Sequence, residues 1–195
     1  MPRRIRRAGV VPRALVLGAL FALAPFGRGI ASDDGRPLAP DFTLTDERGA
    51  RFTLSHQRGR PVVLFFGYAH CPDVCPTLLA NVARALKTIG PAALPVEVAL
   101  VTVDPARDDA ATLRRFVTTF DPAFHGLTGT PAALKPVYRA YHVRYAKGAG
   151  ASGDYLVSHT AFVYYVGRDG RIRSIGTWSD SQEVLTEDLR GIVNR

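Results

Sequence analysis

Sulfur is scarce in this chain of 195 residues. The sequence has two cysteines, Cys71 and Cys75, and a single methionine, which is the initiator Met1. Because an initiator methionine cannot serve a site in a processed domain, Met1 is excluded as a ligand. Any site for a soft metal ion must therefore be built from the two thiols and the five histidines, which are His56, His70, His125, His142 and His159.

Acidic residues are absent from the beginning of the chain. Six arginines precede Ser32 with no acidic residue among them, at positions 3, 4, 6, 7, 13 and 28. Without them, 19 basic residues stand against 17 acidic ones, so the formal charge of +8 falls to about +2. The high isoelectric point belongs to this leader and is not the footprint of a nucleic-acid-binding domain. We therefore expect no nucleic-acid partner.

The chain also lacks a long apolar run. Its most apolar stretch, residues 14–26, falls short of the roughly 20 residues that a membrane-spanning helix needs. It follows a basic segment and precedes small residues, as in an export signal. We predict a signal peptide over residues 1–31, with an uncleaved membrane anchor as the alternative, then a linker over 32–40 and one domain over 41–195.

Both interpretations of the leader place the domain outside a reducing cytosol, in the periplasm or on the outer face of the inner membrane. An anchor would make the protein membrane-associated. Arginine-rich leaders without acidic residues also direct import into organelles, so the host compartment stays open.

The two thiols lie where a strand gives way to a helix. An apolar run, residues 62–66, precedes Cys71 and Cys75, and an amphipathic segment over 76–89 follows them. Backbone N–H groups at the beginning of a helix favour the thiolate, which is the nucleophilic and metal-binding form of cysteine. This position suits chemistry better than packing, with a structural disulfide as the alternative.

The order of the predicted elements is that of a thioredoxin-like fold. We expect an α/β domain with a central mixed sheet, helices on both faces and an N-terminal β-hairpin extension. The segment 142–158 is expected to be a loop or loose hairpin, and Asp108 and Asp109 to favour the start of the helix after them. The predicted strands are 42–44, 51–54, 62–66, 96–103, 160–166 and 171–177, and the predicted helices are 76–89, 112–120, 131–141 and 180–193.

Several motifs together resemble the SCO/SenC family of copper chaperones. The run Phe66-Gly67-Tyr68-Ala69-His70-Cys71-Pro72-Asp73-Val74-Cys75-Pro76 matches the signature of that family. Further matches follow in order: Val103-Asp104-Pro105 with Arg107-Asp108, then Gly126-Leu127-Thr128-Gly129, then Tyr155-Leu156-Val157-Ser158-His159. Asp41-Phe42-Thr43-Leu44 fits as well.

The resemblance implies a thioredoxin fold that binds one copper ion through Cys71, Cys75 and His159. It also implies delivery of that copper to the binuclear site of cytochrome c oxidase. Ala69 and Ser158 depart from the common pattern, which often has Thr and Asp at these positions. Without a carboxylate next to the histidine, the redox behaviour of the site stays open.

Such a ligand set suits a copper carrier. Cuprous ion prefers thiolate and cupric ion prefers imidazole and oxygen, so two thiolates with one imidazole can hold both states. Three protein ligands leave a position at which a recipient ligand can attack. A structural zinc site would need a fourth ligand, and none is apparent in the sequence.

Two enzymatic functions compete with the carrier. Cys71 and Cys75 could form the redox pair of a thiol–disulfide oxidoreductase that reduces the cysteines of the oxidase copper site. A peroxidase is the third candidate, although Tyr68 stands where peroxiredoxins carry Thr or Ser. Expected partners are the copper-site subunit of the oxidase, other copper chaperones and thioredoxin-like reductants.

The other polar residues around the motif receive structural interpretations. His70 is expected to face solvent or a partner, and Asp73 to be an acid at the helix start. Asp104 is assigned a turn or capping role, and Tyr68 a wall of the site. The remaining histidines are interpreted as surface or packing residues: His56, His125 and His142.

Overall fold

The computed structural model describes residues 35–93, 95–149 and 155–194. The chain divides into two compact units, Met1–Ser32 and Asp33–Arg195, and the first lies outside the described residues. The predicted signal peptide or anchor over 1–31 therefore stays a prediction. Within the part of the chain that is described, no helix combines the length and apolarity needed to cross a membrane.

A five-stranded mixed sheet forms the centre of the described domain. Its strand order is β5-β4-β3-β8-β9, and β3 pairs parallel to β4 and antiparallel to β8. All six residues of β3 are buried, as expected for a strand that is covered on both faces. The strands are β3 (Val62–Gly67), β4 (Glu97–Thr102), β5 (His125–Leu127), β8 (Phe162–Val166) and β9 (Ile172–Thr177).

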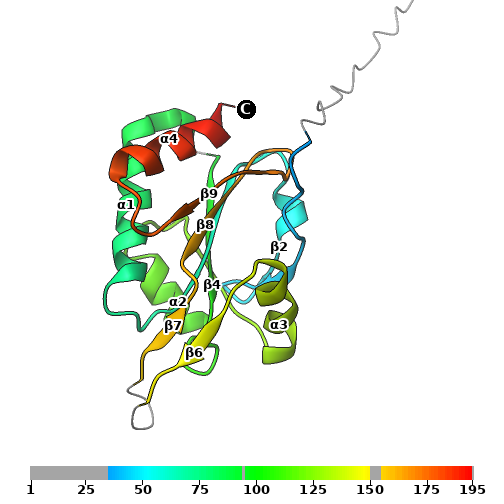
Figure 1. Cartoon of the computed structure of the whole chain (residues 1–195), viewed down its shortest axis with the longest axis vertical. Coiled ribbons are helices and arrows are strands. Elements are labelled where there is room, and N and C mark those ends of the chain that lie inside the picture. Colours follow the sequence, from blue (N-terminus) through cyan, green and yellow to red (C-terminus); the bar gives the residue numbers. More distant parts are fainter. Residues whose placement is uncertain (1–34, 94, 150–154, 195) are drawn as a thin grey trace, which may run out of the picture. The chain divides into compact units, whose positions relative to one another are not determined.

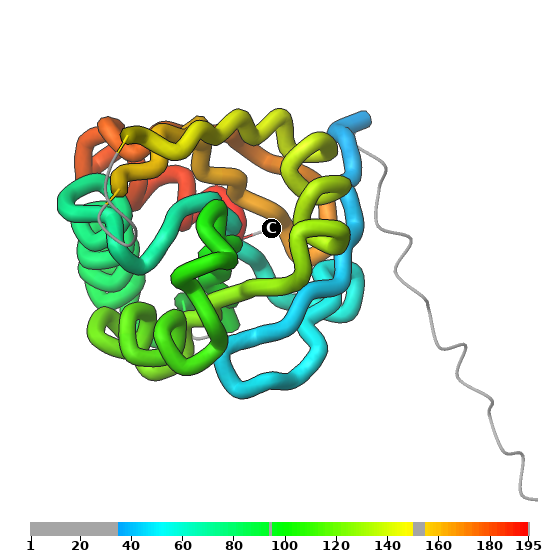
Figure 2. Tube along the Cα trace, turned by 90° about the horizontal axis from the view of Figure 1, so that it is seen from below, coloured from blue at the N-terminus to red at the C-terminus, as the bar shows by residue number. Residues whose placement is uncertain are grey.

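Alternating side chains of β3 enter two separate cores. Val63 and Phe65 pack with side chains of the helices over 74–89, 110–117 and 182–193, whereas Leu64 and Phe66 face the N-terminal hairpin and the helix over 131–140. Figure 2 shows α1 and α2 on one side of the sheet, and α3 with the N-terminal strands on the other. The helices are α1 (Val74–Ile89), α2 (Ala110–Val117), α3 (Pro131–Ala140) and α4 (Gln182–Val193), with short 3-10 helices η1 (Leu54–Gln57) and η2 (Gly90–Ala93).

The N-terminal hairpin consists of β1 (Thr43–Thr45) and β2 (Arg51–Thr53). A bridge between Thr45 and Thr128 joins it to the segment after β5. Further upstream, the Ala39 amide donates to the Gly170 carbonyl at 2.9 Å. Part of the predicted linker thus lies against the turn between β8 and β9.

The predicted fold class is confirmed, with local differences. The loose hairpin expected in 142–158 contains β6 (Tyr145–Lys147) and β7 (Val157–His159), which pair only with each other in the described residues. Figure 1 places this hairpin at the end of the domain remote from α4. Helix α1 begins at Val74, earlier than predicted, so Cys75 lies inside its first turn.

Candidate metal centre

The beginning of α1 brings the two thiols together. Cys71 lies in the turn after β3, and its amide donates to the Tyr68 carbonyl at 3.2 Å. The amide of Cys75, in the first turn of the helix, donates to the Cys71 sulfur at 3.4 Å. Cys71 is partly exposed and Cys75 is buried, and neither forms a disulfide. One thiol therefore faces outward while the other lies beneath it.

Gly67 at the end of β3 makes room for the buried thiol. A Cβ on this residue would lie 2.7 Å from the Cys75 sulfur and 3.0 Å from a Leu100 methyl carbon. Contacts under 3.0 Å are essentially never seen for a real Cβ, so any larger residue here would displace the sulfur. The close approach of Cys75 to the strand thus requires glycine.

The two thiols differ in acidity because they share one proton. Hydrogen bonding from Cys75 outweighs burial and, with the Cys75 and Asp73 amides, lowers the pKa of Cys71 to about 5. The same hydrogen bond and burial raise the pKa of Cys75. The apo site therefore contains a thiolate at Cys71 and a protonated thiol at Cys75.

His159, the last residue of β7, turns its ring toward the buried thiol. Its Nδ1 lies 2.9 Å from the Thr160 carbonyl oxygen, and a carbonyl can only accept, so Nδ1 carries the hydrogen. In the neutral ring Nε2 then presents a lone pair, 3.9 Å from the Cys75 sulfur. The Tyr68 ring packs edge-on against the imidazole, with ring centroids 5.9 Å apart. Tyr68 thus forms a wall of the site, as expected.

The three residues predicted as ligands are adjacent, but their donor atoms do not surround a single point. Among the described residues, the only group of three potential ligands whose atoms all lie within 4.8 Å of one another is elsewhere in the domain. Metal bonds to sulfur and nitrogen are about 2.0–2.3 Å long. Coordination of one ion by all three residues would therefore require their donor atoms to move closer together.

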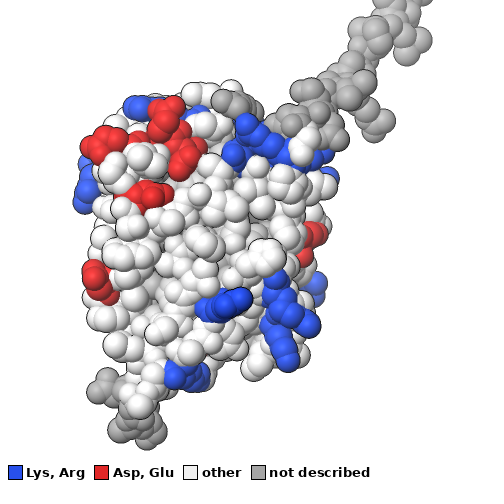
Figure 3. Space-filling view, viewed as in Figure 1, with Lys and Arg blue, Asp and Glu red and all other residues white. Residues whose placement is uncertain are grey.

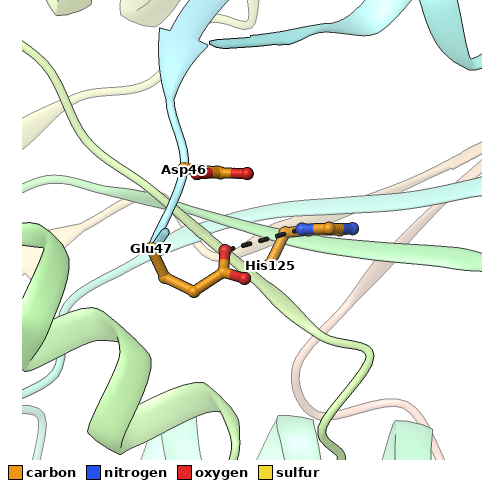
Figure 4. A group of neighbouring side chains, drawn as sticks. All are labelled: Asp46, Glu47 and His125. Carbon is orange, nitrogen blue, oxygen red and sulfur yellow. Dashed lines mark ion pairs between the residues drawn. The ribbon is translucent and has the colours of Figure 1, made fainter. Parts of the chain in front are cut away.

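That other group is Asp46, Glu47 and His125, beside the N-terminal hairpin (Figure 4). His125 Nδ1 lies 3.5 Å from Glu47, and Nε2 lies 2.9 Å from Glu97. These carboxylates, Glu47 first, outweigh burial and raise the pKa of His125 to about 9. Two arginines form ion pairs with these carboxylates: Arg48 with Glu47, and Arg60 with Glu97. We interpret it as an ion-pair cluster and not as a metal centre.

Asp108 corrects one expectation. It does not assist the start of α2; that role belongs to Asp109, which accepts from the Thr112 amide at 2.7 Å. The Asp108 carboxylate is fully buried and accepts from the Ala69 amide at 3.1 Å, within the cysteine turn. Burial raises its pKa. The expectation is wrong because sequence alone cannot show which way a loop side chain turns.

The other polar residues around the cysteine motif agree only in part with the roles expected for them. His70 is half-exposed, with Nδ1 3.5 Å from Asp108. Asp73 occupies the N-cap position of α1, but its side chain caps no backbone amide. Asp104 does more than the expected turn role, because its carboxylate is fully buried and accepts from Tyr155 and Arg107. The motif that contains Asp104 directs attention to this loop, but no local signal predicts the contact with Tyr155.

The fold and the site define a class of protein: a thioredoxin-like domain with a dithiol at a helix start and an imidazole facing it. The SCO1/SenC family model matches residues 31–194. The chain belongs to the SCO1/SenC family.

Sequence relatives agree with this assignment. The chain is 35% identical to the mitochondrial SCO2 homolog of Bos taurus over 153 residues, which is 77% of this chain and 58% of that protein. It thus spans little more than half of the mammalian relative. It is 29% identical to a SCO2-like protein of Rickettsia felis over 192 residues, covering 93% of this chain and 94% of that one.

Solved structures of similar proteins include copper complexes. ScoI of Bradyrhizobium japonicum with copper bound is 38% identical with a TM-score of 0.72, covering 80% of this chain and 99% of that one. ScoI of Arabidopsis thaliana with copper bound is 30% identical with a TM-score of 0.74, covering 82% and 100%. The thioredoxin-like α/β fold is thus shared with proteins that have been crystallised with copper.

Proposed function

We propose that this protein binds one copper ion through Cys71, Cys75 and His159 and delivers it to the binuclear copper site of cytochrome c oxidase during assembly. The observation that carries the proposal is the position of His159 Nε2, 3.9 Å from the buried Cys75 sulfur, which is itself hydrogen-bonded to the Cys71 sulfur. Relatives crystallised with copper support the choice of metal.

The donor set fits copper chemically. A thiolate at Cys71 is ready for a cuprous ion, and the proton of Cys75 is lost when the ion binds. The neutral imidazole adds a borderline nitrogen ligand that also suits the cupric state. The absence of a side chain at Gly67 leaves room for the Cys75 sulfur. Three ligands thus leave the ion open to a recipient.

Delivery requires a partner to cover the site. Phe162 and Trp178, 41% and 42% exposed, line the small cavity beside Cys75 and His159. Figure 3 shows an uncharged area over β8 and β9, with acidic side chains near α4 and basic ones toward α3 and β6. We propose that the oxidase copper-site subunit docks there, on the periplasmic side or outer face of the inner membrane.

Copper titration of the reduced full-length chain tests the ligand assignment. We expect one tightly bound copper(I) per chain, with binding lost in Cys71→Ala and in Cys75→Ala and strongly weakened in His159→Ala. The half-exposed His70→Ala serves as a matched control for histidine removal and should bind as the wild type does. Full affinity in His159→Ala would remove His159 from the proposed ligand set.

A second function, a thiol–disulfide oxidoreductase, is favoured by the unequal acidity of the thiols. The Cys71 thiolate would attack a disulfide of the oxidase subunit and release one of its thiolates, which takes up a proton. Cys75, after losing its proton, would then displace the second thiol and form the Cys71–Cys75 disulfide. A thioredoxin-like reductant would restore the dithiol.

The two functions separate in one variant. His159→Ala removes a proposed copper ligand but leaves both sulfurs, so a carrier would fail in oxidase metallation while a reductase would keep its activity. Reduction of the oxidised copper-site subunit, followed by thiol labelling, measures the second activity. Metallation of an already reduced subunit measures the first. Reduction without any copper transfer would favour the enzyme.

A further inference from the structure

The β6–β7 hairpin, which contains His159, is not part of the central sheet. Strands β6 and β7 form a separate two-stranded sheet, and all three residues of β6 are exposed. An isolated two-stranded hairpin is at best marginally stable in water. The position of His159 relative to the thiols therefore depends on contacts between this hairpin and the rest of the domain.

Two of these contacts are specific hydrogen bonds: the Val157 amide of β7 donates to the Tyr68 hydroxyl at 3.2 Å, and Tyr155, four residues before His159, contacts the loop after β4. The Tyr155 hydroxyl donates to the buried Asp104 carboxylate at 2.8 Å. The Arg107 guanidinium lies over the Tyr155 ring, 3.7 Å from the ring centroid, and also contacts Asp104 through Nε at 2.5 Å. Lys147 of β6 lies 3.5 Å from the same carboxylate. The turn end of the hairpin, where Lys147 and Tyr155 lie, is thus fixed to the loop after β4.

That loop also holds the cysteine turn. Asp108, at its other end, accepts hydrogen bonds from the Ala69 amide at 3.1 Å and the Thr102 hydroxyl at 2.6 Å. The amide of Val103, just before the loop, donates to the Gly67 carbonyl at 2.8 Å. One short segment, residues 103–108, therefore contacts both halves of the candidate metal centre.

We infer that Tyr155 and Asp104 are positioning residues that hold His159 at the dithiol and thereby set copper affinity. The inference rests on the proposed function, since it assumes that His159 is a ligand. Neither residue contacts the thiols, so both act through the placement of β7. An imidazole that is already in place loses less conformational freedom when the ion binds than one on a loose hairpin.

The electrostatics of Asp104 explain why this contact is firm. Burial alone would raise the pKa of Asp104, but the hydrogen bonds from Tyr155 and Arg107 outweigh it and leave the pKa below its ordinary value. The carboxylate is therefore ionised, and hydrogen bonds to charged groups are stronger than neutral ones. Removing the Tyr155 hydroxyl leaves Arg107 and Lys147 to neutralise the charge. Tyr155→Phe should thus loosen the hairpin without unfolding the domain.

A double-mutant cycle between Tyr155→Phe and His159→Ala tests the inference. We expect Tyr155→Phe to weaken copper(I) binding by about tenfold, the effect of losing one charge-assisted hydrogen bond. In the His159→Ala background the same change should have no further effect, because the positioned ligand is gone. Competition with a chromophoric copper(I) chelator measures all four affinities.

Tyr141→Phe is the matched control. It also removes a tyrosine hydroxyl, which donates to the Pro40 carbonyl at 2.7 Å, in the segment before the N-terminal hairpin and not in the β6–β7 hairpin. This variant should bind copper as the wild type does. A loss of affinity equal to that of Tyr155→Phe would show a general loss of stability and would overturn the inference.

A measurement on the copper-free protein supplies a second test. Amide hydrogen exchange at Val157 and His159 should become faster in Tyr155→Phe while exchange in β3 stays unchanged. Equal weakening by Tyr155→Phe with and without His159 would overturn the positioning role but leave the copper site intact. If His159→Ala itself binds copper as the wild type does, the proposed ligand set fails instead. The two failures are therefore distinguishable.

Discussion

The two thiols are four residues apart yet chemically unlike. Cys71 is partly exposed and accepts hydrogen bonds, whereas Cys75 is buried and donates one. An outward thiolate above a buried thiol can accept an ion from solvent and then draw the second sulfur into the coordination shell. The hydrogen bond from the Cys75 thiol is the largest cause of the difference in pKa, and the Cys75 and Asp73 amides at the helix start add to it.

Alkylation of Cys71 should reveal its thiolate. With a pKa of about 5, Cys71 is almost fully ionised above pH 6, so its reaction with iodoacetamide should be nearly independent of pH between 6 and 8. An ordinary thiol, with a pKa of about 8.5, would react roughly tenfold faster per pH unit over that range. Mass spectrometry of the reduced, copper-free protein measures each cysteine separately.

Cys75→Ala provides the comparison for this experiment. The hydrogen bond from Cys75 is the largest cause of the low pKa of Cys71, so its removal should raise that pKa and restore a pH-dependent rate. His159 contributes less, and His159→Ala should change the profile less. A steep profile in the wild type would contradict the proposed thiolate.

Gly67→Ala tests the close approach of Cys75 to β3. The new methyl carbon would lie 2.7 Å from the sulfur, so the sulfur must move away from its place beneath Cys71. We expect copper binding to weaken at least tenfold and the free energy of unfolding to fall by about 1–3 kcal/mol, as in other overpacked cores. Copper titration and urea unfolding measure the two effects.

Gly191→Ala is the control for Gly67→Ala. Gly191 lies inside α4, and a Cβ there meets no atom within 4 Å. Alanine should therefore stabilise the domain by about 0.5–1 kcal/mol through helix propensity, with copper binding unchanged. If Gly67→Ala behaved in the same way, the steric argument would be wrong.

At the scale of elements, the His125 cluster joins the N-terminal hairpin to the edge of the central sheet. His125 begins β5, Glu47 lies in the turn between β1 and β2, and Glu97 begins β4. The Glu47 carboxylate is buried and also accepts from the Gly126 amide at 3.2 Å. A protonated imidazole between two carboxylates thus holds three elements together.

The stabilisation that His125 contributes should consequently fall as the pH rises. The pKa of His125 is about 9 in the folded protein and 6.5 in the absence of its partners, so folding raises it. The contribution is complete below pH 6.5 and disappears as the pH rises through 9, on the order of 1–3 kcal/mol in total. The low pKa of Cys71 changes stability in the opposite direction over the same range. Urea unfolding of the copper-free wild type and of His125→Asn between pH 6 and pH 9 therefore measures this loss as the shrinking difference between the two.

His125→Asn should lower stability at pH 6 and lose this falling contribution, so that its stability falls less, or rises more, with pH than that of the wild type. His142→Asn is its control, since His142 is exposed and has a φ of 53°, which asparagine tolerates. The control should keep the slope of the wild type. An unchanged slope in His125→Asn would show that other groups cause the pH dependence.

The sequence predicts the elements of this fold better than their side-chain partners. Strong apolar runs identify β3, β4 and β8, because a short apolar run between turn residues is typical of a buried strand. The interpretation of His125 as a surface or packing residue is correct in part, since its ring lies 5.3 Å from the Phe52 ring. Its ion pairs join residues 28 and 78 positions away, which no local pattern reveals. The same limit applies to Tyr155 and Asp104.

At the scale of the whole molecule, the candidate copper ligands come from distant parts of the chain. Cys71 precedes α1 and Cys75 lies in its first turn, while His159 ends the β6–β7 hairpin more than eighty residues later, just before β8. From sequence, only the resemblance of motifs to a known family predicts that these residues lie together. The fold brings them together in space, because β8, which follows His159, pairs directly with β3, which precedes Cys71.

Copper should therefore stabilise the whole domain and not only the turn around the thiols. An ion held by both halves of the sheet binds the folded state far better than the unfolded chain. At a free concentration one hundred times its dissociation constant, it would add about 2.7 kcal/mol to the free energy of unfolding. Thermal unfolding of the reduced protein with and without copper(I), under anaerobic conditions, measures the shift.

Two variants serve as comparisons for this shift. It should be much smaller in His159→Ala, where the ion contacts only the cysteine turn, and as large as in the wild type in His70→Ala. An equal shift in the wild type and His159→Ala would mean that the thiols alone bind the ion, and that the two halves of the sheet are not coupled through it.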